Sequence, residues 1–108
     1  MIIYLASPYS HADAEVRRAR FEQICQVAAR LMAQGVHVFS PIAHTHPVAL
    51  AGDLPKHWEF WEEYDRKFIA ICAELWICMM DGWEESRGIA AELRIAAELG
   101  LPVRYVAP

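Results

Sequence analysis

The chain has 108 residues, of which 56% are hydrophobic, and its formal net charge at pH 7 is −4. This length and composition suit one compact domain with its own core, so we expect a single domain over residues 1–108. The acidic balance and the absence of a basic tract argue against nucleic acid as the main partner. Arg17, Arg18 and Arg20 accompany glutamates on one predicted helix, and we expect them to form a solvated face; the alternative is a contact with a phosphate or a partner.

The compartment is predicted from three features of the sequence. No apolar run approaches the roughly 20 residues that a membrane-spanning helix needs. No signal peptide precedes the first predicted strand. The cysteines Cys25, Cys72 and Cys78 lie in apolar stretches without C-x-x-C spacing, which is typical of buried, reduced thiols. We therefore expect a cytoplasmic protein without a membrane partner.

Apolar periodicity predicts that strands and helices alternate along the chain. The expected strands cover residues 2–6, 36–40, 75–80 and 103–106, and the expected helices 12–34, 57–72 and 86–99. The segment 41–56 has three prolines and shows neither period, so we expect a long connection there, of a kind that is often functional. The alternation predicts an α/β fold: a small flavodoxin- or Rossmann-like three-layer sandwich with a parallel sheet of four or five strands.

Three segments leave the carboxyl ends of the predicted strands, where parallel sheets bind their ligands. They cover residues 7–10, 41–57 and 81–88. The polar and aromatic candidates of this chain fall in these segments or on the helices that they open. The sequence therefore predicts one site at that edge of the sheet.

Residues 86–92 spell S-x-G-x-x-x-E at the predicted start of the last helix. A helix that begins near Ser86 offers free backbone N–H groups and the positive end of its dipole to an anion. Gly88 lets a ligand lie close to the first turn, and Glu92 follows four residues later on the same face. A sugar phosphate bound there would present its ring carbon to the carboxylate. The alternative is an ordinary capped helix, because these residue types are common at such places.

A repeat inside the same helix offers a second glutamate. Ile89-Ala90-Ala91-Glu92-Leu93 recurs six residues later as Ile95-Ala96-Ala97-Glu98-Leu99. Six residues at about 100° each place the two glutamates on different faces. Glu98 also lies in the last turn, far from the helix start, so we expect it to be a solvated surface charge.

Asp65 lies inside the apolar stripe that Trp61, Phe68 and Ile69 define on the middle helix. A carboxylate in such a stripe needs a partner or a function. If it meets Glu92 across a pocket, one of the two carboxyls can stay ionised while the other holds a proton. The alternative is one charge among several on a wet helix face.

Aromatic and histidine side chains are the remaining candidates. The run of Trp58, Phe60, Trp61 and Tyr64 either covers the core or forms a stacking wall for a planar base. His44 and His46 form H-x-H in the predicted connection. No third ligand at a recognisable spacing joins them, so a hydrogen bond or a proton given to a substrate is favoured over a metal site.

The chain resembles the nucleoside 2-deoxyribosyltransferase-like superfamily, which includes the 2′-deoxynucleoside 5′-phosphate N-hydrolases. The resemblance covers nearly the whole length and is closest to the small bacterial and phage proteins of the DUF1937 type. It rests on the first strand with its serine-containing loop, on the aspartate of the middle helix and on S-x-G-x-x-x-E, that is on Tyr4, Ser7, Asp65, Ser86, Gly88 and Glu92.

The resemblance implies a role for each of these residues. Glu92 would be the nucleophile at the anomeric carbon, Asp65 would hold the sugar or assist departure of the base, and Tyr4 would orient the nucleophile. A serine at position 86 favours a 5′-phosphate, which an aspartate would repel. The resemblance implies no metal and no cofactor. The expected substrate contacts are Ser7, Pro8, Tyr9, His44, His46, Trp61, Ser86, Arg87 and Gly88.

Three functions follow as hypotheses. The first is an enzyme that cleaves the N-glycosidic bond of a deoxynucleotide or related nucleoside phosphate, by hydrolysis or by transfer of the sugar. The second is a non-catalytic module that binds or senses a nucleotide in the same pocket. The third is a histidine-based metal hydrolase. The resemblance also implies a homo-oligomer, a dimer or a tetramer, whose pockets border a neighbouring subunit.

Overall fold

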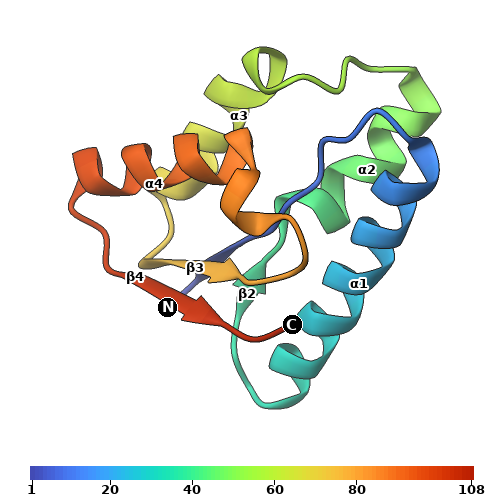
Figure 1. Cartoon of the computed structure of the whole chain (residues 1–108). Helices are drawn as coiled ribbons and strands as arrows, with labels where there is room; N and C mark the ends of the chain where they lie inside the picture. The colour runs from blue at the N-terminus through green and yellow to red at the C-terminus, as the bar shows by residue number, and fades with distance from the viewer.

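Four parallel strands form one sheet in the order β2-β1-β3-β4 in the computed structural model, which describes residues 1–108 (Figure 1). The strands are β1 (Ile3–Ala6), β2 (Val38–Phe39), β3 (Glu74–Cys78) and β4 (Val103–Val106). The helices are α1 (Ala14–Ala33), α2 (Pro41–Gly52), α3 (Trp58–Ala70) and α4 (Arg87–Leu99), and a 3-10 turn covers Trp83–Glu85. The predicted parallel α/β sheet is confirmed.

Alternating side chains of β1 separate two apolar clusters, one on each face of the sheet. Ile3 and Leu5 pack with the buried face of α1. Tyr4 and Ala6 pack on the other side, with the buried residues of α3 and α4. Figure 1 shows α1 on one side of the sheet and α3 and α4 on the other, so the molecule has the three layers that the sequence predicts.

The prediction of an irregular connection over residues 41–56 is wrong, because these residues include the helix α2. Pro41 occupies the first turn, where a missing N–H costs nothing, and the Ser40 hydroxyl accepts a hydrogen bond from the Ala43 N–H. Pro47 is the one proline in the helix interior, and Gly52 is its last residue. The prolines therefore mark the start of a helix and do not exclude one.

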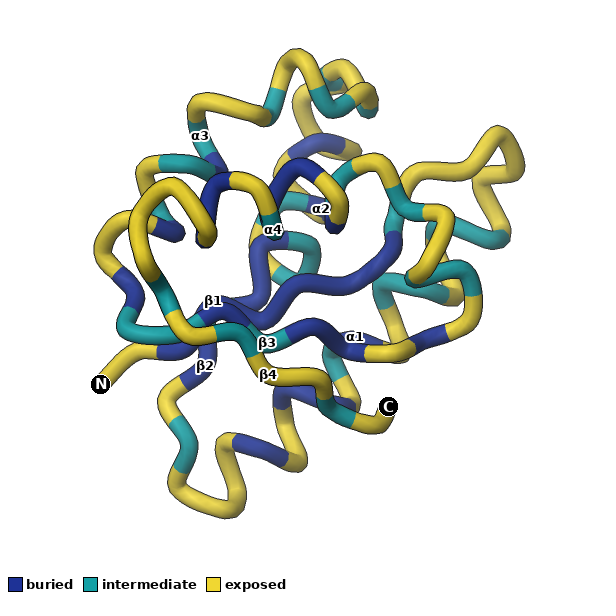
Figure 2. Tube along the Cα trace, turned by 60° about the vertical axis from the view of Figure 1, so that its left-hand side comes forward, coloured by how far each residue is buried: buried dark blue, intermediate teal, exposed yellow.

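The central strand β1 marks the point where the chain changes direction. The connection through α1 leads to β2 on one side of β1, whereas α2 and α3 lead to β3 on the other side. In doubly wound sheets the crevice at such a point receives the ligand. Ser7 and Pro8, which begin the loop at this edge, are buried. Figure 2 shows the buried stretch of β1 continuing beyond the end of this strand.

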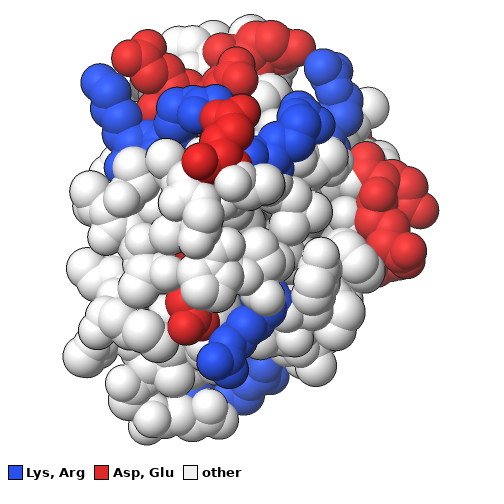
Figure 3. Space-filling view, turned by 90° about the vertical axis from the view of Figure 1, so that its left-hand side faces the viewer, with Lys and Arg blue, Asp and Glu red and all other residues white.

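Cysteines and surface charges complete the description. All three cysteines are free, with Cys72 and Cys78 buried and Cys25 half-buried. None of the helices combines the length and the apolar composition that crossing a bilayer requires. On the face seen in Figure 3, basic and acidic side chains are mixed along the upper rim, an acidic group lies at the right and a basic group lies near the bottom.

Candidate active site

A cavity opens at the carboxyl ends of β1 and β2, and 16 residues line it. They come from the loop after β1, from α2 and the connection behind it, from the inner face of α3 and from the first two turns of α4. The three segments that the sequence singles out therefore meet around one space. The predicted site residues that line it are Ser7, Tyr9, His46, Trp61, Asp65, Ser86, Gly88 and Glu92.

Glu92 is the most buried carboxylate of this cavity. The Ser86 hydroxyl accepts a hydrogen bond from the Ile89 N–H at 3.2 Å and so fixes the start of α4. From that start the helix aims Glu92 inward, where its residue is only 4% exposed. The Tyr4 hydroxyl donates a hydrogen bond to Glu92 Oε2 at 2.7 Å. No basic side chain forms an ion pair with this carboxyl, which leaves its free oxygen for a ligand in the cavity.

Burial shifts the protonation of two carboxyls in the cavity. It raises the pKa of Glu92 to about 8; the charge of Asp65 adds to the shift, and the Tyr4 hydrogen bond opposes it. Burial likewise raises the pKa of Asp65 to about 7, and the Tyr4 hydroxyl again opposes the shift. The pair therefore holds at least one proton near neutral pH. Two carboxyls that titrate in this range can divide the roles of nucleophile and acid.

The start of α4 is open to an anion. The N–H groups of Arg87 and Gly88 have no partner in the chain, since the cap serves Ile89. A second hollow adjoins the cavity, shares Ser86 and Gly88 with it and is lined by the cationic side chains of Arg17, Lys56 and Arg87. Glu59 and Glu85 also line it, so three positive charges face two negative ones.

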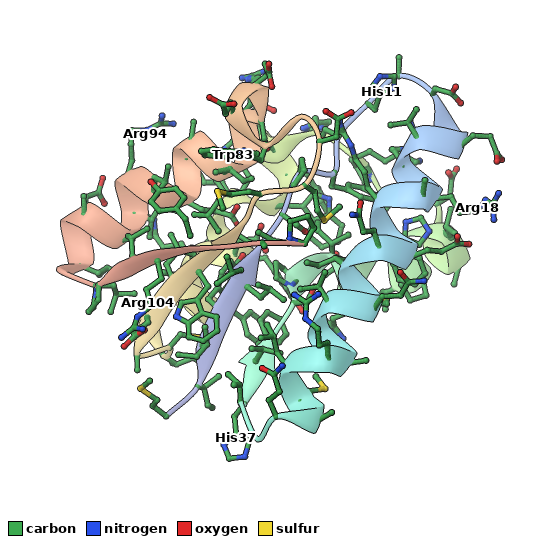
Figure 4. All side chains as sticks on the ribbon, turned by 60° about the horizontal axis from the view of Figure 1, so that its bottom comes forward. His11, Arg18, His37, Trp83, Arg94 and Arg104 are labelled. Atoms are coloured by element: carbon green, nitrogen blue, oxygen red, sulfur yellow. The ribbon has the colours of Figure 1, made fainter.

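The three clustered arginines of α1 have different surroundings. Arg18 forms exposed ion pairs with Glu15 and Glu22, as a solvated face requires, and points outward in Figure 4. Arg17 instead donates hydrogen bonds to the backbone carbonyls of His11 and Ala12 and lines the second hollow. Arg20 is half-buried and donates to the carbonyls of Tyr9 and Ser10. The expectation of a solvated face thus holds for Arg18 but not for Arg17 or Arg20.

His46 is held in the cavity wall by its neighbours. A hydrogen bond of 2.6 Å joins its Nδ1 to the Tyr9 hydroxyl, and its ring stacks on Phe21 with centroids 4.2 Å apart. Burial, helped by the charge of Arg17, lowers the pKa of His46 and so favours the neutral ring. A neutral imidazole whose Nδ1 is engaged can offer its other nitrogen to a ligand.

His44 does not share this position. Because both histidines lie on α2 and not in a loop, a separation of two residues turns their side chains to opposite sides of the helix. His44 is exposed and lines an outer groove between α2 and α3, near Phe60. No group of three or more potential ligands in the chain could hold a metal ion. The H-x-H pair is therefore not one site in this structure.

The other predicted contacts divide between the cavity and its surroundings. Trp61 lines the cavity and donates its indole N–H to the Pro55 carbonyl at 2.8 Å. Pro8 belongs to the loop after β1, where it is buried and does not line the cavity. Tyr4 does not line the cavity, and its hydroxyl acts on the two carboxyls that do, Glu92 and Asp65. Arg87 belongs to the second hollow.

Sequence reasoning missed the part of the cavity that α2 supplies. Pro41, Ile42, Thr45 and Ala49 line it together with His46. Their spacing of four residues is typical of one face of a helix. The signal was present in the sequence, but it has meaning only when residues 41–52 are recognised as helical.

The fold is that of a nucleoside-processing enzyme of known structure. A 2-deoxyribosyltransferase from the psychrotolerant bacterium Bacillus psychrosaccharolyticus is similar over 100% of this chain and 73% of its own, with 24% sequence identity and a TM-score of 0.64. No curated protein matches the chain. The chain belongs to the DUF1937 family, a domain of unknown function, whose model matches residues 1–107. The predicted family and the deoxyribosyltransferase-like fold are thus confirmed.

Proposed function

We propose that the protein cleaves the N-glycosidic bond of a nucleoside or deoxynucleoside 5′-monophosphate and passes the sugar to water or to another base. Glu92 is the nucleophile. The observation that carries this proposal is the carboxyl of Glu92, which is buried in the cavity wall, oriented by the Tyr4 hydroxyl and unpaired with any cation.

The reaction has two steps at one carbon. In the first, the free Glu92 oxygen forms a bond to C1′ while the bond from C1′ to the base nitrogen breaks and its electron pair leaves with the base. The proton of Asp65, whose pKa of about 7 keeps the acid form populated at neutral pH, goes to the departing base. In the second step the oxygen of water or a nitrogen of another base forms a bond to C1′, the Asp65 carboxylate takes the proton of this attacking group, and the Glu92 carboxylate leaves.

The start of α4 supports the proposal that the substrate carries a 5′-phosphate. The free N–H groups of Arg87 and Gly88 can bind phosphate oxygens, and the helix dipole favours their charge. The side chains of Arg17, Lys56 and Arg87 surround the adjoining hollow and add long-range attraction. Glu92 lies one turn further along α4, so that a phosphate at the helix start leaves the sugar ring beside the carboxylate.

The aromatic wall of the cavity supports a planar base as the other end of the substrate. Trp58 and Trp61 line the cavity from the start of α3, and His46 faces the same space from α2. Indole rings offer flat apolar faces on which a base can stack. The remaining nitrogen of His46 can give or accept one hydrogen bond with an edge of the base.

One observation favours a second candidate, a nucleotide-binding module without turnover. The raised pKa of Glu92, about 8, keeps much of this carboxyl protonated at neutral pH in the empty cavity. A protonated Glu92 can donate a hydrogen bond to a ligand but cannot attack carbon. Catalysis therefore requires that the bound substrate favours the ionised form, since the hydrogen bond from Tyr4 already acts on the carboxyl in the empty cavity.

An assay of free base separates the two candidates. Wild-type protein is incubated with a panel of ribo- and deoxyribonucleoside 5′-monophosphates, and the released base is measured by chromatography. We expect release from at least one member and none from Glu92→Ala. Ligands that bind, as measured by calorimetry, and stay intact would overturn the enzyme and support the binding module.

A further inference from the structure

Ser7 stands out among the polar groups of the cavity. It follows directly after β1, it is 6% exposed, and it is one of the residues that line the cavity. Ser7 Oγ has no hydrogen-bond partner, and it is the one buried side-chain oxygen or nitrogen in the chain for which this is true. Ser7 and Pro8 are buried like the residues of β1, and Figure 2 shows the buried stretch continuing beyond this strand.

The other hydroxyls around the cavity are already engaged within the chain. Thr45 donates to the Pro41 carbonyl at 2.8 Å, and the Ser86 hydroxyl caps α4. The Tyr9 hydroxyl is joined to His46. A buried hydroxyl without a partner destabilises the protein unless a ligand completes it. Ser7 is thus the uncommitted hydroxyl with which the cavity can bind one polar atom of its ligand.

The stereochemistry of the reaction indicates which atom that is. In a nucleoside the base lies above the sugar ring, and the 2′ and 3′ hydroxyls of a ribose lie below it. A nucleophile that displaces the base attacks from below, so the wall that holds Glu92 faces these hydroxyls. Asp65 and Ser7 are the other buried polar side chains that line the cavity beside Glu92, apart from His46, which pairs with Tyr9.

We propose that Ser7 binds the 2′-hydroxyl of the substrate, and that the preferred substrate class is the ribonucleoside 5′-monophosphate. The inference rests on the proposed function. A 2′-deoxyribose has no hydroxyl at C2′ and leaves Ser7 without a partner, whereas the 2′-hydroxyl of a ribose completes it. Sites built to bind a substrate hydroxyl discriminate against analogues that lack it, because their own polar group then stays unpaired.

The test measures binding in the Glu92→Gln variant, which cannot form the sugar ester. Calorimetry compares three ligands with the same base: the ribonucleoside 5′-monophosphate and its 2′-deoxy and 3′-deoxy analogues. We expect the ribonucleotide to bind about tenfold more tightly than the 2′-deoxynucleotide. Adding Ser7→Ala should reduce this ratio to about one. Ser10→Ala is the control: its hydroxyl lies at the exposed edge of the cavity and is bonded to the Lys56 carbonyl, so its removal should change the binding of all three ligands alike, if at all, and leave the ratio unchanged.

Each other outcome overturns a defined part of the proposal. If no nucleotide binds, the proposed function itself fails. If nucleotides bind with equal affinity for both sugars, or if Ser7→Ala leaves the ratio unchanged, the 2′-hydroxyl assignment fails while the proposed function stands. If Ser7→Ala weakens all three ligands equally, Ser7 contacts the base or the phosphate. If it removes only the penalty of the 3′-deoxy analogue, Ser7 reads the 3′-hydroxyl. A melting curve of each variant checks that the fold is intact.

Discussion

The two halves of α4 carry the same five residues in two different environments. In Ile89–Leu93 the glutamate Glu92 is 4% exposed, touches the Tyr4 hydroxyl and has its pKa raised to about 8 by burial. In Ile95–Leu99 the glutamate Glu98 has a side chain that is 59% exposed and pairs with Arg66 at 2.8 Å. The rotation of the helix over six residues makes this difference. An identical local sequence thus gives a buried reactive carboxyl in one place and a solvated charge in the other.

The largest effect should come from exchanging the two glutamates for glutamine, one at a time. Glu92→Gln removes the nucleophile but keeps its size, and we expect the release of base to fall by about 10³-fold or more. Glu98→Gln is the matched control and should leave the rate within about twofold, because Glu98 lies on the outer face of α4. Steady-state rates with the best nucleotide of the panel check both. Equal losses of rate in the two variants would show that Glu92 is not the nucleophile and that the burial of its carboxyl does not set it apart in catalysis from Glu98.

The next effect should come from Asp65. Asp65→Asn cannot protonate the departing base, and we expect a loss of about 10²-fold to 10³-fold in kcat. The loss should shrink for analogues whose base is a better leaving group, since these need less protonation. Glu63→Gln, on the exposed side of the same helix, is the control. A loss that does not depend on the leaving group would assign Asp65 to sugar binding alone.

How much of this site follows from sequence can be judged from particular residues. The 3.6-residue period places Glu92 and Asp65 on inward faces and Glu98 on an outward face, and the structure has them there. The period of residues 41–52 was obscured by Pro47 and by an almost uniformly apolar composition, so the cavity wall formed by α2 was not foreseen. The open hydroxyl of Ser7 could not be foreseen either, because a missing partner is a property of the three-dimensional packing.

A smaller effect should come from Tyr4→Phe, which deletes the hydrogen bond to Glu92. Because this bond stabilises the ionised carboxyl, its loss raises the pKa of Glu92 further. Because Glu92 must be ionised and Asp65 protonated, we expect kcat/KM of the wild type to be bell-shaped in pH, with its maximum between about 7 and 8. In Tyr4→Phe the maximum should move to higher pH, and the rate at pH 7 should fall by about tenfold. A pH profile that falls in height without moving along the pH axis would contradict the role of Tyr4 in holding the charge.

The smallest effect is on stability, and its sign follows from the same pKa. Because burial raises the pKa of Glu92 from its usual 4.5 to about 8, ionisation costs free energy in the folded chain only. The stability present below pH 4.5 is therefore lost as the pH rises through about 8. At pH 9 we expect Glu92→Gln to unfold at a temperature higher than the wild type by roughly 5 °C or more, and at pH 4 to differ little.

The matched control for stability is again Glu98→Gln. Its surface pair with Arg66 contributes less than about 1 kcal/mol to the free energy of unfolding, so its melting temperature should follow the wild type at both pH values. Thermal melts monitored by circular dichroism give both comparisons. If Glu92→Gln is no more stable than the wild type at pH 9, the carboxyl is not held in the apolar environment that the structure shows.

The most direct test of the account asks whether the sugar becomes bonded to Glu92. The wild type is incubated with a nucleoside 5′-monophosphate that carries fluorine at C2′, because fluorine there slows both steps, and the reaction is stopped with acid. Mass spectrometry should find a gain of one sugar phosphate per chain, and the modified peptide should contain Glu92 and not Glu98. Base released without any sugar on the protein, or sugar on a residue other than Glu92, would contradict the account.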